Sequence, residues 1–121
     1  MMDSIYYLHI LGRIIFGGYF IYSGISHFLN SKMMSGYAGS KGVPAPMIAV
    51  IGSGILLFLG GLGVLFQVHV RWALLLIAIF LVPVTLMMHN FWADKDPMAR
   101  MGNRINFLKN VAMLGAVLMM F

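Results

Sequence analysis

Several side chains able to bind a polar headgroup lie near the ends of long apolar segments. Imidazole exchanges protons near neutral pH, and ammonium and amide groups donate hydrogen bonds to carbonyl or anionic groups. Ionisable residues inside such segments are rare and commonly functional. Antiparallel packing of the segments would gather, at one membrane interface, His27, His89, Asn90, Trp92, Asn106, Lys109 and Asn110. We therefore expect a polar pocket there, suited to the polar headgroup of a small ligand.

Each of these groups also has a structural interpretation. His27 and His89 can cap helix ends or bond neighbouring asparagines, and Lys109 can pair with Asp94 or Asp96 instead of a ligand. A bis-histidine haem site is a third interpretation, which the position of both imidazoles at segment ends disfavours. The choice between ligand binding and structural roles stays open at this point.

A second intramembrane polar site is expected around His9 and Arg13 in the first apolar segment. An arginine at the centre of a membrane helix costs about 2.5–3.5 kcal/mol on insertion scales. No acidic residue within an apolar segment is available to pair with Arg13. Two interpretations follow: an anion or headgroup site on the outer side, or a structural role in which Arg13 snorkels outward or bonds backbone carbonyls at a helix end.

The amino-acid composition argues against thiol chemistry and against a metal site. The chain has no cysteine, which excludes thiolate nucleophiles, thiolate metal sites and disulfides. Its 12 methionines include adjacent pairs that invite a copper(I) interpretation. Adjacent residues point to different faces of a helix, however, so apolar packing is the better interpretation and we expect no metal site.

The elements that position these residues follow from the composition and the apolar runs. Of 121 residues, 61% are hydrophobic and 9% charged, with a mean hydropathy of +0.93. A soluble domain is excluded because about a quarter of its residues would be charged. The apolar runs are continuous rather than alternating, which favours helices over a β-barrel. We predict an all-α fold and a single membrane domain over 1–121, a four-helix bundle with helices at about 5–29, 47–66, 72–89 and 103–121.

Helical periodicity orients the first of these helices. At a rotation of about 100° per residue, one stripe along the face of this helix contains Tyr6, His9, Arg13, Gly17, Phe20, Gly24 and His27. Glycines permit close helix packing and ionisable groups avoid lipid, so this stripe should face the bundle interior. The His27-Phe28 pair is weakly repeated in His89-Asn90-Phe91. Such an internal repeat is consistent with two related helix hairpins.

Basic residues set the expected orientation in the membrane. The first and third connections share one side and carry Lys32, Lys41, Lys95, Arg100 and Arg104, with Lys109 just inside the last helix. The other side has Arg13 and Arg71. The positive-inside rule then puts both connections and the polar pocket on the cytoplasmic side and both termini outside. The basic residues form no patch interleaved with aromatics, so lipid and not nucleic acid is the expected surrounding.

Blocks along most of the chain resemble the DoxX family of small four-helix membrane proteins. They are Gly12-Arg13, Ser26-His27-Phe28, Gly42-Val43-Pro44-Ala45-Pro46, Gly60-Gly61-Leu62-Gly63, His89-Asn90-Phe91-Trp92, and Asn106-Phe107-Leu108-Lys109-Asn110 followed by Ala112 and Gly115. The resemblance implies this fold and an association with redox systems rather than a particular reaction. We expect a bacterial cytoplasmic (inner) membrane and an accessory subunit of an oxidoreductase system rather than a self-sufficient enzyme. Quinone is then the expected ligand and an oxidoreductase subunit the expected partner.

The sequence departs from the thiol-linked members of that family. It lacks cysteine, which disfavours a direct disulfide role and leaves quinone or partner binding as the compatible functions. The alternative is a non-catalytic membrane scaffold that assembles a larger complex, for which glycine faces would serve helix packing, within one chain or between copies in a homo-oligomer.

Overall fold

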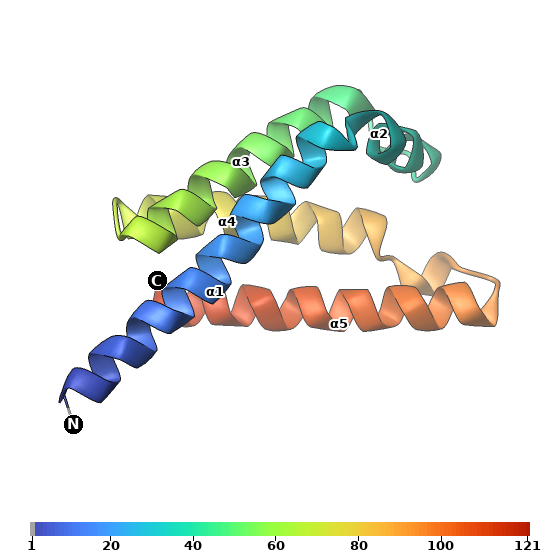
Figure 1. The fold of residues 1–121 in the computed structure, drawn as a ribbon. Helices are drawn as coiled ribbons and strands as arrows, with labels where there is room; N and C mark the ends of the chain where they lie inside the picture. Colours follow the sequence, from blue (N-terminus) through green and yellow to red (C-terminus); the bar gives the residue numbers. More distant parts are fainter. Residues whose placement is uncertain (1) are drawn as a thin grey trace.

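A computed structural model describes residues 2–121, and every regular element in that range is helical (Figure 1). The elements in chain order are α1 (Met2–Leu29), α2 (Ser31–Ser40), α3 (Pro46–Phe66), α4 (Val70–Met88), the 3-10 helix η1 (Phe91–Ala93) and α5 (Pro97–Met120). The predicted all-α class is confirmed.

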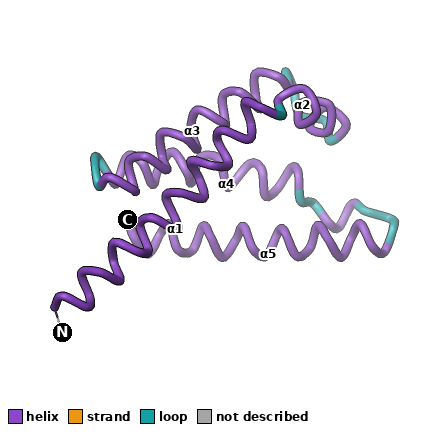
Figure 2. Tube along the Cα trace, in the orientation of Figure 1, coloured by secondary structure: helices purple, strands orange, loops and turns teal. Residues whose placement is uncertain are grey.

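The long helices pack as a series of neighbours. α1 lies against α3, α3 against α4, and α4 against α5, while α2 covers one end of α3. No comparable contact joins the described parts of α1 and α5, so the predicted four-helix bundle is open between these two helices. Figure 2 shows the short loops at the two ends: both termini and the α3–α4 turn lie at one end, and α2 and η1 at the other.

The interface between α1 and α3 is built on facing glycines. A Cβ atom added at Gly17 would lie 2.8 Å from the carbonyl oxygen of Gly61, and one added at Gly24 would lie 2.7 Å from that of Gly54. Backbones can approach this closely only where side chains are absent. The seven-residue spacing of both pairs keeps them on one face of each antiparallel helix, which positions the rest of α1 against α3.

The predicted interior stripe of α1 is correct for its second half and wrong for its start. Phe20 is 1% exposed and His27 7% exposed, whereas Tyr6 is 60% exposed and His9 is also exposed. The first turns of α1 extend beyond the other helices (Figure 1), so no described helix covers them.

The buried core is small and the outer surface apolar. Side chains with under 2% exposure come from α1, α3, α4 and α5: Phe20, Leu57, Leu74, Ile77, Leu81 and Val117. Large apolar residues such as Ile14, Ile48 and Leu86 are more than half exposed. Three helical segments are long and apolar enough to cross a membrane, namely Asp3–Leu29, Pro46–Phe66 and Val70–Ala93. The chain is therefore an integral membrane protein whose exposed apolar side chains face lipid.

α5 differs from its predicted form in two ways. It starts at Pro97 and not near Asn103, because the Asp96 side chain accepts a hydrogen bond from the Ala99 amide at 3.1 Å and Pro97 occupies the first helical position. Among residues 2–121 it is also the one long helix that is not apolar enough to count as a span, since Arg104, Lys109 and three asparagines lower its mean hydropathy. We predicted four membrane-spanning helices, whereas three helical segments among the described residues meet this criterion and α5 does not.

The first connection, 30–46, is also more ordered than predicted. Ten of its residues form α2, and the chain turns at Gly42, whose φ of 83° is a left-handed conformation that glycine adopts without strain. Glycine, serine and proline made this segment look like a loop, but the helix ends before the prolines and its Ala38 side chain is buried.

Candidate functional site

A partly open cavity of about 160 Å³ lies between α1, α4 and α5. Its apolar wall consists of Phe20, Phe80, Leu81, Val84 and Met113. Its polar wall consists of Tyr19, Ser23, His89, Asn106, Lys109 and Asn110. Because α1 and α5 do not close on each other, the cavity lies where the series of helices is open.

Asn110 is the most unusual residue of this cavity. Its side chain is 7% exposed, yet its amide makes no hydrogen bond with another described residue. Buried amides are nearly always hydrogen-bonded. No side-chain nitrogen or oxygen among the described residues is both sealed and unpartnered, so the Asn110 amide must be reachable from the cavity that it lines. A ligand there would meet both an amide donor and an amide acceptor.

Lys109 and Asn106 join Asn110 on the same wall. Neither makes a side-chain hydrogen bond or ion pair with a described residue. The alternative pairing of Lys109 with Asp94 or Asp96 does not occur within residues 2–121: Asp94 contacts Asn103 and Lys41, and Asp96 caps α5. Asp96 lies 13 residues before Lys109, which corresponds to about 20 Å along a helix. The ammonium is therefore available to a ligand.

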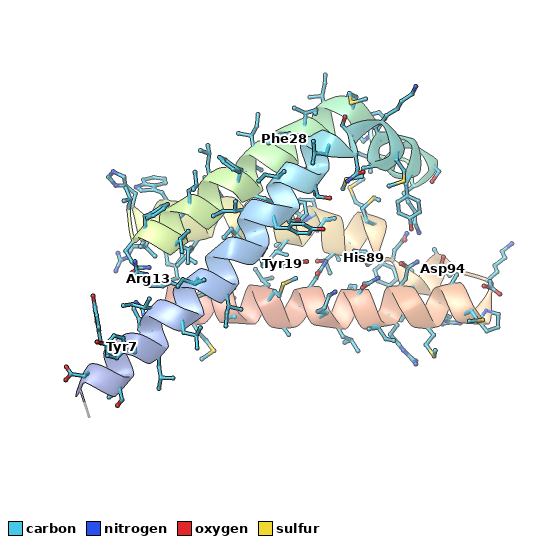
Figure 3. All side chains as sticks on the ribbon, in the orientation of Figure 1. Tyr7, Arg13, Tyr19, Phe28, His89 and Asp94 are labelled. Atoms are coloured by element: carbon cyan, nitrogen blue, oxygen red, sulfur yellow. The ribbon has the colours of Figure 1, made fainter. Side chains whose placement is uncertain are left out.

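His89 connects the cavity to a polar network at the end of α4. Its Nδ1 lies 3.5 Å from Oδ1 of Asn103, whose amide nitrogen donates to Asp94 Oδ2 at 2.7 Å. Lys41, at the end of α2, donates to Asn90 Oδ1 at 2.9 Å and lies 4.0 Å from Asp94 Oδ1. Figure 3 shows His89 and Asp94 beside the first half of α5. This network ties the first and third connections together at one edge of the cavity.

His27 does not reach the cavity. Its Nδ1–H points at the Val50 carbonyl oxygen at 3.1 Å and lies 3.0 Å from Oγ of Ser53, while its ring meets the ring of Phe80 edge-on at 5.6 Å. The structural interpretation therefore describes His27: it joins α1 to α3 and lies behind the cavity wall at Phe80.

Asn90 and Trp92 also lie outside the cavity lining. Asn90 accepts the hydrogen bond from Lys41 described above. Trp92 is 53% exposed and packs edge-on against Phe107 and Phe91, at centroid distances of 5.6 and 5.4 Å. An exposed tryptophan at the end of a membrane helix is typical of the lipid interface.

Arg13 has the structural role that we left open. Its Nε and one terminal nitrogen donate to the carbonyl oxygen of Leu65 at 3.2 and 2.8 Å. Leu65 lies in the last turn of α3, where carbonyls lack partners within the helix. Figure 3 shows Arg13 beside that end of the helix hairpin, and His9 is exposed without a described hydrogen-bond partner. No hydrogen bond joins the described side chains of His9 and Arg13.

Three further residues, Tyr19, Ser23 and Phe80, line the cavity although we did not predict them from the sequence. Tyr19 and Ser23 are four residues apart and share one face of α1, and this spacing of two hydroxyl groups in an apolar helix was the available signal. Figure 3 shows Tyr19 on the side of α1 that looks toward α4 and α5. Within residues 2–121, no three His, Asp or Glu side chains cluster as a metal site would require.

Comparison with models of protein families identifies a family for this chain. The family model named DoxX matches residues 8–90, which covers most of α1 and all of α2 to α4 and stops before η1 and α5. No curated protein and no solved structure matches the chain. The matched segment includes the glycine interface and His89, while Asn106, Lys109 and Asn110 lie beyond it. Since that match covers more than half of the chain, this protein belongs to the DoxX family.

Proposed function

We propose that this DoxX protein is a quinone-binding subunit of a membrane redox system. The headgroup would lie in the cavity between α1, α4 and α5. The observation that carries the proposal is the Asn110 amide, which is buried, reachable from the cavity and unpartnered among the described residues. Electrons would pass between the quinone and a partner polypeptide, while this chain binds and orients the ring.

The size of the cavity supports this ligand class. A cavity of about 150 Å³ in another protein is large enough for benzene, and the cavity here measures about 160 Å³. One six-membered ring therefore fits between Phe20, Phe80 and Leu81, with aromatic and aliphatic surface for the ring faces. An isoprenoid tail would leave through the opening between α1 and α5 toward lipid.

The polar wall of the cavity also supports a quinone as the ligand. Lys109 only donates hydrogen bonds, and the amide groups of Asn106 and Asn110 both donate and accept. Together they offer more than one donor to a ring carbonyl oxygen from a single face of α5. His89 lines the same cavity from a different helix, α4.

A binding titration tests the proposal. A short-chain benzoquinone is titrated into the protein in lipid nanodiscs, and binding is followed by calorimetry. We expect Asn110→Leu, a substitution of similar volume, and Lys109→Met each to weaken binding about tenfold, the loss of roughly one hydrogen bond to a polar group. Asn30→Leu is the matched control, since Asn30 bonds only within its own turn. Equal affinity in all four proteins would overturn the proposal.

The orientation expected from the basic residues belongs to the same proposal. It puts α2 and η1 on the cytoplasmic side of a bacterial inner membrane, and with them the His89 network. Because the chain has no cysteine, Ser35→Cys and His69→Cys place one thiol each at opposite ends of the helices. Impermeant thiol reagents added to intact cells should label His69→Cys and spare Ser35→Cys, and the reverse pattern would contradict this orientation.

A second candidate role, as a scaffold for a partner, is favoured by the start of α1. Tyr7 and Leu8 are 68% and 67% exposed on turns that extend past the other helices (Figure 1). A photoreactive amino acid in place of Tyr7 should then form one discrete protein adduct in the native membrane. Adducts with lipid alone would exclude this role. The glycine pairs do not serve it, because they are buried between α1 and α3.

A further inference from the structure

The hydrogen bonds at one edge of the cavity fix the direction in which an amide points. A carboxylate only accepts hydrogen bonds, so the group of Asn103 that lies 2.7 Å from Asp94 Oδ2 must be its NH2. The Asn103 oxygen then faces the other way, where it lies 3.5 Å from Nδ1 of His89. The other carboxylate oxygen of Asp94 faces the Lys41 ammonium at 4.0 Å, which holds the carboxylate from the opposite side.

An amide oxygen facing Nδ1 selects one form of the neutral imidazole. Nδ1 must carry the proton in order to donate to Asn103 Oδ1, and Nε2 is then an acceptor with a free lone pair. Nε2 makes no hydrogen bond with any described residue, and His89 lines the cavity. We propose that Asp94 and Asn103 hold His89 in the Nδ1–H form, so that Nε2 accepts a hydrogen bond from a ligand hydroxyl and the cavity prefers the reduced, hydroquinone form.

This inference rests on the proposed function and adds the redox form of the ligand. A hydroquinone has two hydroxyl groups: one can donate to His89 Nε2, and the other can accept from Lys109 while it donates to the Asn110 amide oxygen. A quinone has only acceptor oxygens and loses the contact with His89. The loss of one such hydrogen bond predicts about 3- to 10-fold tighter binding of the hydroquinone. Asp94 and Asn103 are positioning residues here, since neither lines the cavity.

The proton position can be measured without any ligand. The protein is labelled with nitrogen-15 histidine and studied by NMR at about pH 8, above the ordinary histidine range; the His89 signals are those lost in His89→Gln. We expect the Nδ1–H form in the native protein and a mixture of both forms in Asn103→Leu and in Asp94→Asn, where the Asn103 amide is free to flip. Asp96→Asn is the matched control, because Asp96 caps α5 and does not contact Asn103.

The ligand arm uses short-chain benzoquinone and its hydroquinone, the latter kept reduced under argon. The native protein and Asp96→Asn should bind the hydroquinone about 3- to 10-fold more tightly, and Asn103→Leu should bind both forms equally. An unchanged His89 spectrum in both Asn103→Leu and Asp94→Asn would overturn the inference, as would equal binding of the two forms by the native protein. Absence of binding of either form would instead refute the proposed function.

Discussion

The close approach of α1 and α3 makes a prediction that two adjacent glycines can test. A Cβ atom added at Gly17 would lie 2.8 Å from the Gly61 carbonyl oxygen, 3.0 Å from the Leu65 amide nitrogen and 3.1 Å from Leu65 Cβ. Two of these atoms belong to the backbone and cannot rotate away. At Gly18, the next residue, an added Cβ would have no neighbour within 4 Å.

These distances set the expected size of the effect. Forcing an extra methyl group into a packed interface costs about 1–3 kcal/mol, and replacing a helical glycine by alanine returns up to about 1 kcal/mol of helix propensity. Gly18→Ala should therefore stabilise the protein by up to about 1 kcal/mol. The propensity gain is shared by both variants, so Gly17→Ala should be less stable than Gly18→Ala by about 1–3 kcal/mol.

The comparison uses the free energy of unfolding in mixed micelles. Sodium dodecyl sulfate is titrated into each protein, and unfolding is followed by tryptophan fluorescence. The difference between the two variants isolates the interface, because both substitutions lie in the same helix and make the same chemical change. Equal stabilities, or a more stable Gly17→Ala, would show that the backbones of α1 and α3 are not in contact there and would refute the glycine account of this interface.

Three further outcomes follow from single contacts. Arg13→Met should lower stability by about 1.5–3 kcal/mol, the contribution of hydrogen bonds from a charged group, and should leave quinone affinity unchanged in the nanodisc titration; a loss of affinity at native stability would make Arg13 a ligand residue instead. Asp96→Ala should lower stability by about 0.5–2 kcal/mol and Asp96→Asn should not, because asparagine caps a helix equally well; equal unfolding curves for Asp96→Ala and the native protein would show that this cap is dispensable. Lys41→Met should speed backbone hydrogen exchange in α2, whose end is tied to Asn90 and Asp94 by this lysine; exchange rates that do not change would mean that packing alone holds α2.

The sequence predicts the long apolar helices well, but it does not predict where α5 starts or that α2 is a helix. Continuous apolar runs and the spacing of Gly17 and Gly24 identify the helices and the face of α1 that packs on α3. The start of α5 was missed because Asp96-Pro97, a helix-start signal, lies in a charged stretch that looked like a connection. The helix α2 was missed because glycine and serine dominate its composition, although its ends carry the usual turn residues.

The candidate site was predictable in part. His89, Asn106, Lys109 and Asn110 line one cavity, as the polar faces of their segments indicated. We assigned His27 to the same pocket because it lies at the end of α1, at the same depth in the membrane as the other pocket residues. Depth alone does not determine the direction in which a side chain points from its helix. The His27 ring faces α3 and Phe80 instead. Tyr19 belongs to the cavity because α1 and α5 stay apart, a relation between helices that no single helix pattern contains.

The central claim is that the cavity between α1, α4 and α5 holds a quinone ring, and photoaffinity labelling tests it most directly. A photoreactive short-chain quinone is irradiated with the protein in nanodiscs, and the modified residues are located by mass spectrometry. We expect labels on cavity residues such as Tyr19 and Met113, and we expect these labels to be lost when excess unlabelled quinone is added. Labels spread over lipid-facing residues such as Leu8 and Ile48, unaffected by competitor, would contradict it.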